Sequence, residues 1–86
     1  MNKYARVPDL IVDLHRHTIR EATRVLDDLL AREETLHVRL IVGKGIHSEK
    51  GPVLRDFVVD YLHERGIRFA RAKLVDGGEG ALEAFL

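Results

Sequence analysis

Residues 12–18 read Val-Asp-Leu-His-Arg-His-Thr, and they connect a short apolar run to a helical pattern. The stretch therefore predicts a strand that turns directly into a helix, with an acid, two histidines and a hydroxyl at the turn. Turns at the carboxyl ends of strands are where open α/β sheets bind ligands. The first expectation is an α/β fold with a site at this turn.

The residues on either side of this stretch extend the prediction. Residues 10–14 form the first strand, and Thr18 stands three residues before Glu21 in the pattern of a capping box. Apolar residues then recur at helical spacing, which predicts a helix over residues 19–33. Residues 36–42 are rich in Leu, Ile and Val and too short for a typical helix, so they predict a central strand.

The second half of the chain continues this alternation. The Gly-Lys-Gly of residues 43–45 ends the second strand, and apolar residues at helical spacing predict a second helix that Gly66 caps. Residues 68–75 predict a third strand, whose uneven apolar pattern indicates a bulge near Phe69 or a later start. A glycine-rich turn and a last strand over residues 81–86 follow.

The expected fold class is α/β: a two-layer sandwich in the order β-α-β-α-β-β, with two helices on a mixed four-stranded sheet. Strands joined through a helix usually lie parallel, whereas the last strand follows a tight turn and is expected to be antiparallel to the third. The domain is expected to span residues 10–86, after a short N-terminal extension of residues 1–9. Its expected core includes Leu26, Leu29, Val58 and Leu62.

In this topology the polar and glycine-rich segments of the chain are expected to lie together at one edge of the sheet. The carboxyl ends of the first two strands share an edge if those strands are parallel. The amino end of the second helix and the glycine-rich turn are expected along the same edge. We call this edge the rim, and it comprises residues 13–15, 43–45 and 76–80.

Composition limits the functional classes. The 86 residues have the apolar content, 45%, and the charged content, 33%, that are typical of one globular domain. The chain has no cysteine, which excludes disulfides and thiolate metal sites, and no apolar stretch is long enough to span a membrane. The first residues lack the apolar segment of a signal peptide, so the cytoplasm is the expected compartment.

The net charge is zero, but its distribution along the chain is uneven. Residues 1–20 and residues 42–55 each carry a net charge of +2, whereas residues 21–34 carry −3. Zero net charge argues against a large basic field for gripping a nucleic-acid backbone. A small electropositive patch forms if the two basic segments meet in space.

The His-x-His pair of residues 15–17 resembles the first motif of the polymerase-and-histidinol-phosphatase superfamily of metal-dependent phosphoesterases. Imidazoles two residues apart on a strand point to the same face, where they could share a metal ion. That family builds its site in a barrel far longer than this chain, with further ligands downstream. The resemblance does not extend beyond residues 12–18.

Five motifs in order resemble the Smr (small MutS-related) domain family over nearly the whole chain. They are Asp13-Leu14-His15, Thr18 with Glu21-Ala22, Gly43-Lys44-Gly45, Leu54-Arg55 with Val58, and Gly77-Gly78-Glu79-Gly80-Ala81. The resemblance implies a βαβαββ sandwich and an association with nucleic-acid cleavage. In that family the cleavage is nicking of DNA or endonucleolytic cutting of RNA, including at stalled ribosomes.

Two positions depart from common patterns of that family. Arg16 stands where many members have glycine, and Val42 stands where many have His or Thr. A side chain that could bind a phosphate is therefore missing at residue 42, and His47 is a candidate substitute.

The resemblance and the residue types together suggest acid–base cleavage of a phosphodiester without a metal. His15 is the leading candidate for proton transfer, because imidazole can give or take a proton near neutral pH. Asp13 is expected to orient His15, to act as the base itself, or to serve a structural role. The expected catalytic residues are Asp13 and His15, and the expected phosphate-binding residues are Arg16, His17, Gly43, Lys44, Gly45, His47, Lys50 and Arg55.

Two function classes remain open from the sequence: an endonuclease, and a non-catalytic module that binds DNA, RNA or the ribosome. The intact Asp13-Leu14-His15 favours the first class, whereas the zero net charge and Val42 favour the second. The sequence assigns no cofactor and leaves a divalent metal ion as an open alternative. A monomer without a membrane partner is expected.

Overall fold

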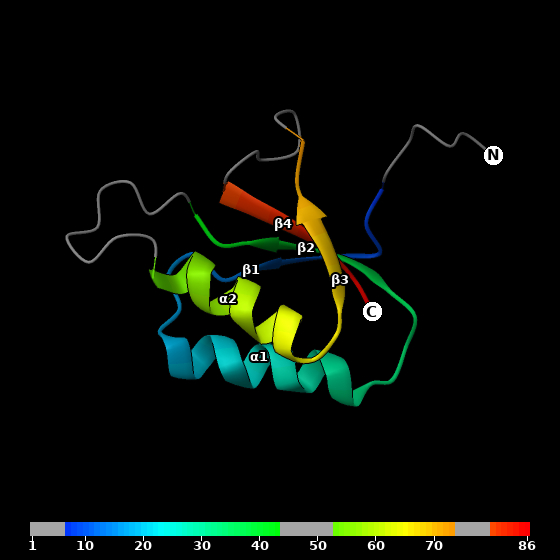
Figure 1. Cartoon of the computed structure of the whole chain (residues 1–86), viewed down its shortest axis with the longest axis horizontal. Coiled ribbons are helices and arrows are strands. Elements are labelled where there is room, and N and C mark those ends of the chain that lie inside the picture. The colour runs from blue at the N-terminus through cyan, green and yellow to red at the C-terminus, as the bar shows by residue number, and fades with distance from the viewer. Residues whose placement is uncertain (1–6, 44–52, 74–79) are drawn as a thin grey trace.

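The computed structural model describes residues 7–43, 53–73 and 80–86. Its elements are β1 Leu10–Asp13, α1 Ile19–Ala31, β2 His37–Ile41, α2 Val53–Glu64, β3 Arg68–Arg71 and β4 Ala81–Phe85. Both helices cover the same face of the sheet (Figure 1). The expected two-layer βαβαββ sandwich is confirmed. Within the described ranges, neither helix has the length and apolar content that crossing a membrane requires.

The four strands form one mixed sheet in the order β1-β2-β4-β3. β1 and β2 pair in parallel, with Asp13 opposite Ile41 at their carboxyl ends. β4 is antiparallel to both β2 and β3 and lies between them, so β2 is an interior strand as expected. The sequence predicted the directions of the strands but not the insertion of the last strand between the second and the third.

Neither the bulge near Phe69 nor the later strand start, the two explanations expected for the uneven pattern, is found, because β3 begins at Arg68. β3 pairs with β4 in regular register from Arg68 to Arg71. The uneven apolar pattern is caused by the charged residue Arg71. Arg71 lies opposite the buried Leu82 and is therefore on the helix side of the sheet. It is nevertheless exposed, because β3 is an edge strand.

α1 starts at the capping box that the sequence predicts, but it ends earlier than predicted. The Thr18 hydroxyl accepts the backbone N–H of Glu21, and the Glu21 carboxylate accepts the N–H of Thr18, which completes the capping box. The helix ends at Ala31 rather than at residue 33. Glu33 has a left-handed φ of 54°, and no glycine marks this turn in the sequence.

The end of α2 is formed by Gly66, as expected. Gly66 has a φ of 68°, which costs glycine little. Its N–H donates to the carbonyl of His63 at 3.1 Å, and the N–H of Ile67 donates to the carbonyl of Leu62 at 2.9 Å. This pair of bonds is a Schellman motif, and it turns the chain back toward the sheet as β3.

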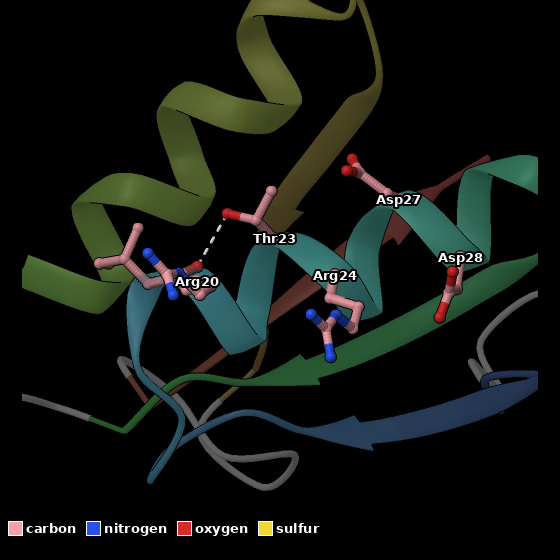
Figure 2. A pocket seen from close by; sticks show the side chains of 6 residues that line it. Arg20, Thr23, Arg24, Asp27 and Asp28 are labelled. Atoms are coloured by element: carbon pink, nitrogen blue, oxygen red, sulfur yellow. Dashed lines mark hydrogen bonds between the residues drawn. The ribbon is translucent and has the colours of Figure 1, made fainter.

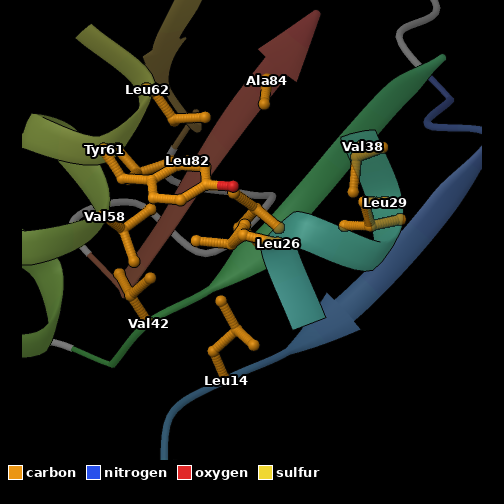
Figure 3. Close-up of a cluster of buried hydrophobic side chains, with 11 residues drawn as sticks. Leu14, Leu26, Leu29, Val38, Val42, Val58, Tyr61, Leu62, Leu82 and Ala84 are labelled. Carbon is orange, nitrogen blue, oxygen red and sulfur yellow. The ribbon is translucent and has the colours of Figure 1, made fainter. Parts of the chain in front are cut away.

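One apolar core lies between the helices and the sheet (Figure 3). The four residues expected there from the two helices are all buried, and they pack with Leu14, Val38, Leu40, Val42, Tyr61, Leu82 and Ala84. Val42 is only 4% exposed, so its side chain belongs to this core and not to the surface of the rim. Burial of such a set is the main source of stability in a domain of this size.

Polar side chains pair on the face of the sheet opposite the helices. Glu83 of β4 is 8% exposed, and its carboxylate accepts Arg39 Nε–H at 2.8 Å and lies 2.5 Å from His37 Nε2. Burial raises the pKa of Glu83, but the hydrogen bonds from Arg39 and His37 outweigh that effect and hold the pKa below its usual value of 4.5. We call these three residues the Glu83 cluster.

Candidate functional site

The rim begins where β1 ends, with Asp13 and His15 in direct contact. Asp13 Oδ1 lies 2.5 Å from His15 Nδ1 and also accepts the backbone N–H of His15 at 3.0 Å. Both side chains are open to solvent, at 57% exposed for Asp13 and 43% for His15. Between them Leu14 is fully buried, so the core anchors the middle of the motif while its two polar ends face outward.

These hydrogen bonds decide the electrostatics of Asp13. The bond to the His15 ring, followed by the bond from the His15 backbone, holds the pKa of Asp13 below its usual value. A carboxylate with a lowered pKa is a poor proton acceptor near neutral pH. Of the three roles considered for Asp13, the geometry therefore favours orienting the imidazole.

Arg16 occupies the other side of the His15 ring. Its Nε–H donates to His15 Nε2 at 3.2 Å. The two contacts together place the single proton of a neutral His15 on Nδ1, toward Asp13, and leave Nε2 as an acceptor. A chain of three side chains, Asp13, His15 and Arg16, therefore lies on the exposed rim. The sequence offered no sign of the contact between Arg16 and His15, because residue types do not show which way neighbouring side chains turn.

His17 and Thr18 link this chain to α1. The N–H of His17 donates to the carbonyl of Leu14 at 2.9 Å, which closes a tight turn around His15. His17 is half-buried. The backbone and side-chain hydrogen bonds of Thr18 hold the pKa of Glu21 below its usual value, and the nearby His17 adds a smaller effect in the same direction. The Thr18 hydroxyl is used by the helix cap, as expected, and so it serves structure rather than catalysis.

Gly43 and Gly80 bring the ends of β2 and β4 to the same place. A Cβ added to Gly43 would stand 3.4 Å from the Cβ of His15, so the first glycine of the Gly-Lys-Gly motif is a neighbour of the imidazole. The carbonyl of Gly80 accepts the N–H groups of both Val42 and Gly43, at 2.8 Å and 3.0 Å. The expected convergence of three motifs on one rim is confirmed for the residues that the structure describes.

The remaining expected site residues are only partly described. Lys44, Gly45, His47 and Lys50 lie outside the described residues. Arg55 is half-buried in the first turn of α2. The amino ends of α1 and α2 lie at the same end of the molecule as the carboxyl ends of β1 and β2 (Figure 1, left). This arrangement agrees with the position expected for the second helix.

The described part of the rim offers few donors to a metal ion. Among the described ranges, no three His, Asp or Glu side chains are grouped closely enough to hold an ion. His15 has both ring nitrogens engaged, Nδ1 with Asp13 and Nε2 with Arg16, so the His-x-His pair is not arranged as a bidentate metal site.

Together these features define a class: a two-layer α/β domain with a carboxylate-oriented histidine, a guanidinium and two glycine turns on one exposed rim. The model of the Smr domain family matches residues 12–86, and the chain belongs to that family. Smr domains are a nucleic-acid-binding fold.

A solved structure agrees with this assignment at the level of the fold. The solution structure of the B3BP Smr domain superposes with a TM-score of 0.66 at 24% sequence identity, and the match covers 88% of this chain and 76% of that chain. A comparison with curated proteins gave no significant match.

Proposed function

We propose that this chain is an endonuclease that cleaves phosphodiester bonds of RNA or DNA by acid–base catalysis. The observation that carries the proposal is the contact of Asp13 Oδ1 with His15 Nδ1 at 2.5 Å on an exposed rim. A carboxylate that binds one ring nitrogen fixes the tautomer and presents the other nitrogen for proton transfer. Membership of the Smr domain family supports nucleic acid as the substrate class.

With RNA, His15 Nε2 takes the proton of a 2′-hydroxyl as that oxygen attacks the adjacent phosphorus. The P–O2′ bond forms while the P–O5′ bond breaks, which leaves a 2′,3′-cyclic phosphate. The departing 5′ oxygen takes a proton from water, and His15 later returns its own proton to solvent. Asp13 stabilises the imidazolium in between. With DNA, a water molecule replaces the 2′-hydroxyl as the nucleophile.

Arg16 has to leave His15 before this step, because its Nε–H donates to the same Nε2 that serves as the base. A substrate phosphate is the better acceptor for a guanidinium, because it carries a negative charge that a neutral imidazole nitrogen lacks and can accept two N–H groups at once. We assign Arg16 the role of moving from His15 to the phosphate, so that substrate binding frees the base. The other proposed phosphate-binding residues are His17, Gly43, Lys44, Gly45, His47, Lys50 and Arg55.

The test is cleavage of labelled RNA and of supercoiled DNA, with and without EDTA. His15→Ala is expected to lower the cleavage rate about 100-fold or more, as loss of a general base does. His63→Ala, which removes an exposed histidine from the far end of α2, is the matched control and is expected to cleave normally. Cleavage that survives both EDTA and His15→Ala would rule out the proposed mechanism.

Binding without cleavage is the second candidate function. Two observations favour it. The side chain of Val42 packs in the core, at the position where many Smr domains have a His or Thr that could bind a phosphate. The net charge of the chain is zero. Salt-sensitive binding to nucleic acid or to ribosomes that Lys44→Ala weakens, with no cleavage, would establish this function instead. For either function we propose a cytoplasmic monomer.

A further inference from the structure

Two arginines on α1 take no part in the proposed cleavage site. Arg20 and Arg24 are one helical turn apart, and both are exposed. Within the described ranges, neither guanidinium forms an ion pair. Arg24 lies close enough to Glu21 to influence its pKa, but the Glu21 carboxylate is already hydrogen-bonded to the N–H of Thr18. Both guanidinium groups are therefore available to a ligand.

Apart from Glu21 in the first turn, the charges along α1 stand in the order that the helix dipole disfavours. Cations are favoured near the carboxyl end of a helix and anions near its amino end. On α1, Arg20 and Arg24 stand in the amino-terminal half, Asp27 and Asp28 stand in the carboxyl-terminal half, and the last turn has no basic residue. Arg20 and Arg24 therefore gain no stabilisation from the dipole where they stand, whereas a bound anion would neutralise their charge.

The surface around the two arginines suits a polymer rather than a small ion. They line an open hollow of about 580 Å³ together with Ile19, Thr23, Asp27 and Asp28 (Figure 2). Ile19 is 37% exposed there and offers apolar contact to a sugar or to an unpaired base. The acids stand at the far end of the hollow, and Asp27 accepts the Tyr61 hydroxyl at 2.5 Å. Carboxylates repel phosphate, so the favourable stretch ends before them.

We propose that Arg20 and Arg24 bind successive phosphates of a single nucleic-acid strand that leaves the Asp13–His15 pair and runs along α1. Residues one turn apart are separated by about 6 Å along a helix axis, a spacing that neighbouring phosphates of a flexible strand can match. α1 begins directly after the motif, with Thr18 as its cap, so the two arginines follow the site closely along the chain. The inference rests on the proposed function for the identity of the ligand.

The test is the salt dependence of binding, because the slope of log affinity against log salt counts the phosphates that a protein neutralises. The probes are fluorescent oligouridine and oligothymidine, followed by anisotropy. Arg20→Gln and Arg24→Gln are each expected to reduce the slope by about 0.7, and the double variant by about 1.4. Arg20→Lys and Arg24→Lys are expected to keep the wild-type slope, because lysine still neutralises a phosphate.

Arg32→Gln is the matched control, since it removes the same charge from the opposite end of α1. It is expected to leave the slope unchanged. Thermal unfolding followed by circular dichroism is expected to show that Arg20→Gln folds as well as the wild type, because a cation in the first turn opposes the dipole. If this variant shows a smaller slope of log affinity against log salt, the change is then due to binding and not to folding.

The outcomes separate this inference from the proposed function. A reduced slope with both probes supports contact with the shared phosphodiester backbone. A reduction with only one probe, or an equal reduction in Arg32→Gln, would overturn the assignment to the backbone. If the wild type binds and the Gln variants keep its slope, the inference fails while the cleavage proposal stands. If the wild type binds neither probe, both fail.

Discussion

Gly43 combines two constraints at the centre of the rim. Its φ of 74° lies in the left-handed region, and a Cβ added to it would stand 3.4 Å from the Cβ of His15. The N–H of the same residue is bonded to Gly80, which fixes the backbone in this position. The glycine of the Gly-Lys-Gly motif thus lets the chain after β2 pass close to His15, apart from the proposed contact of its own amide with a phosphate.

Gly43→Ala is expected to lower the free energy of unfolding by about 1–2 kcal/mol, the cost of a left-handed residue with a Cβ. It is also expected to slow cleavage, because the new methyl group crowds His15. Gly66→Ala is the matched control, with a φ of 68° and no atom within 4 Å of the added Cβ. Urea denaturation measures the first effect and the cleavage rate the second. Equal cleavage by the two variants would show that crowding of His15 is unimportant.

At the level of elements, one polar contact ties the two helices together. Tyr61 of α2 is 3% exposed, and its hydroxyl donates to Asp27 of α1 at 2.5 Å. The guanidinium of Arg65 lies 3.6 Å from the centre of the Tyr61 ring. Burial, followed by the hydrogen bond to Asp27, raises the pKa of Tyr61 to about 12. The contact holds α1 in place and with it the arginines that α1 carries.

Tyr61→Phe is expected to lower the free energy of unfolding by about 1 kcal/mol, because the ring still packs and only the hydrogen bond is lost. The raised pKa also sets a pH dependence. An unfolded tyrosine loses its proton near its usual pKa of 10.0, while folded Tyr61 keeps it to about 12. The contribution of Tyr61 is therefore complete below pH 10 and declines from there to about pH 12. Urea denaturation across this range should show the decline in the wild type and not in Tyr61→Phe.

At the level of the whole molecule, the sequence predicted the succession of helices and strands along the chain and the directions of the strands, because periodicity and turn residues are local signals. It did not predict the place of β4, because the choice of a partner strand depends on the complete sheet. Orientation of His15 by Asp13 was one of the three roles that the sequence left open for Asp13. The contact of Arg16 with His15 was not predicted, nor was the Glu83 cluster, because both depend on how side chains turn once the backbone is folded.

The Glu83 cluster is expected to dominate the loss of stability in acid. Its carboxylate has a folded-state pKa below the usual 4.5, so its contribution is complete above pH 4.5 and is lost as the pH falls through the lower folded value. Glu83→Gln is expected to lower the free energy of unfolding at neutral pH by about 2–3 kcal/mol. It is also expected to make the free energy of unfolding fall less steeply as the pH drops below 4.5. Urea denaturation over a pH series measures both effects.

Glu64→Gln is the control for that series, because its side chain is 75% exposed and its nearest cation, Arg65, is 4.0 Å away. It is expected to change the free energy of unfolding by less than about 0.5 kcal/mol. If the free energy of unfolding falls as steeply in acid for Glu83→Gln as for the wild type, other carboxyl groups control acid unfolding.

The central place of β4 has a consequence for how the domain is made. β4 follows every other strand along the chain, yet it pairs with β2 on one side and β3 on the other. During synthesis the ribosome releases β1, β2 and both helices before the strand that completes the sheet. Until residues 81–85 emerge, the edges of β2 and β3 stay unpaired and open to wrong partners. The sheet therefore cannot be completed before the last strand has been made.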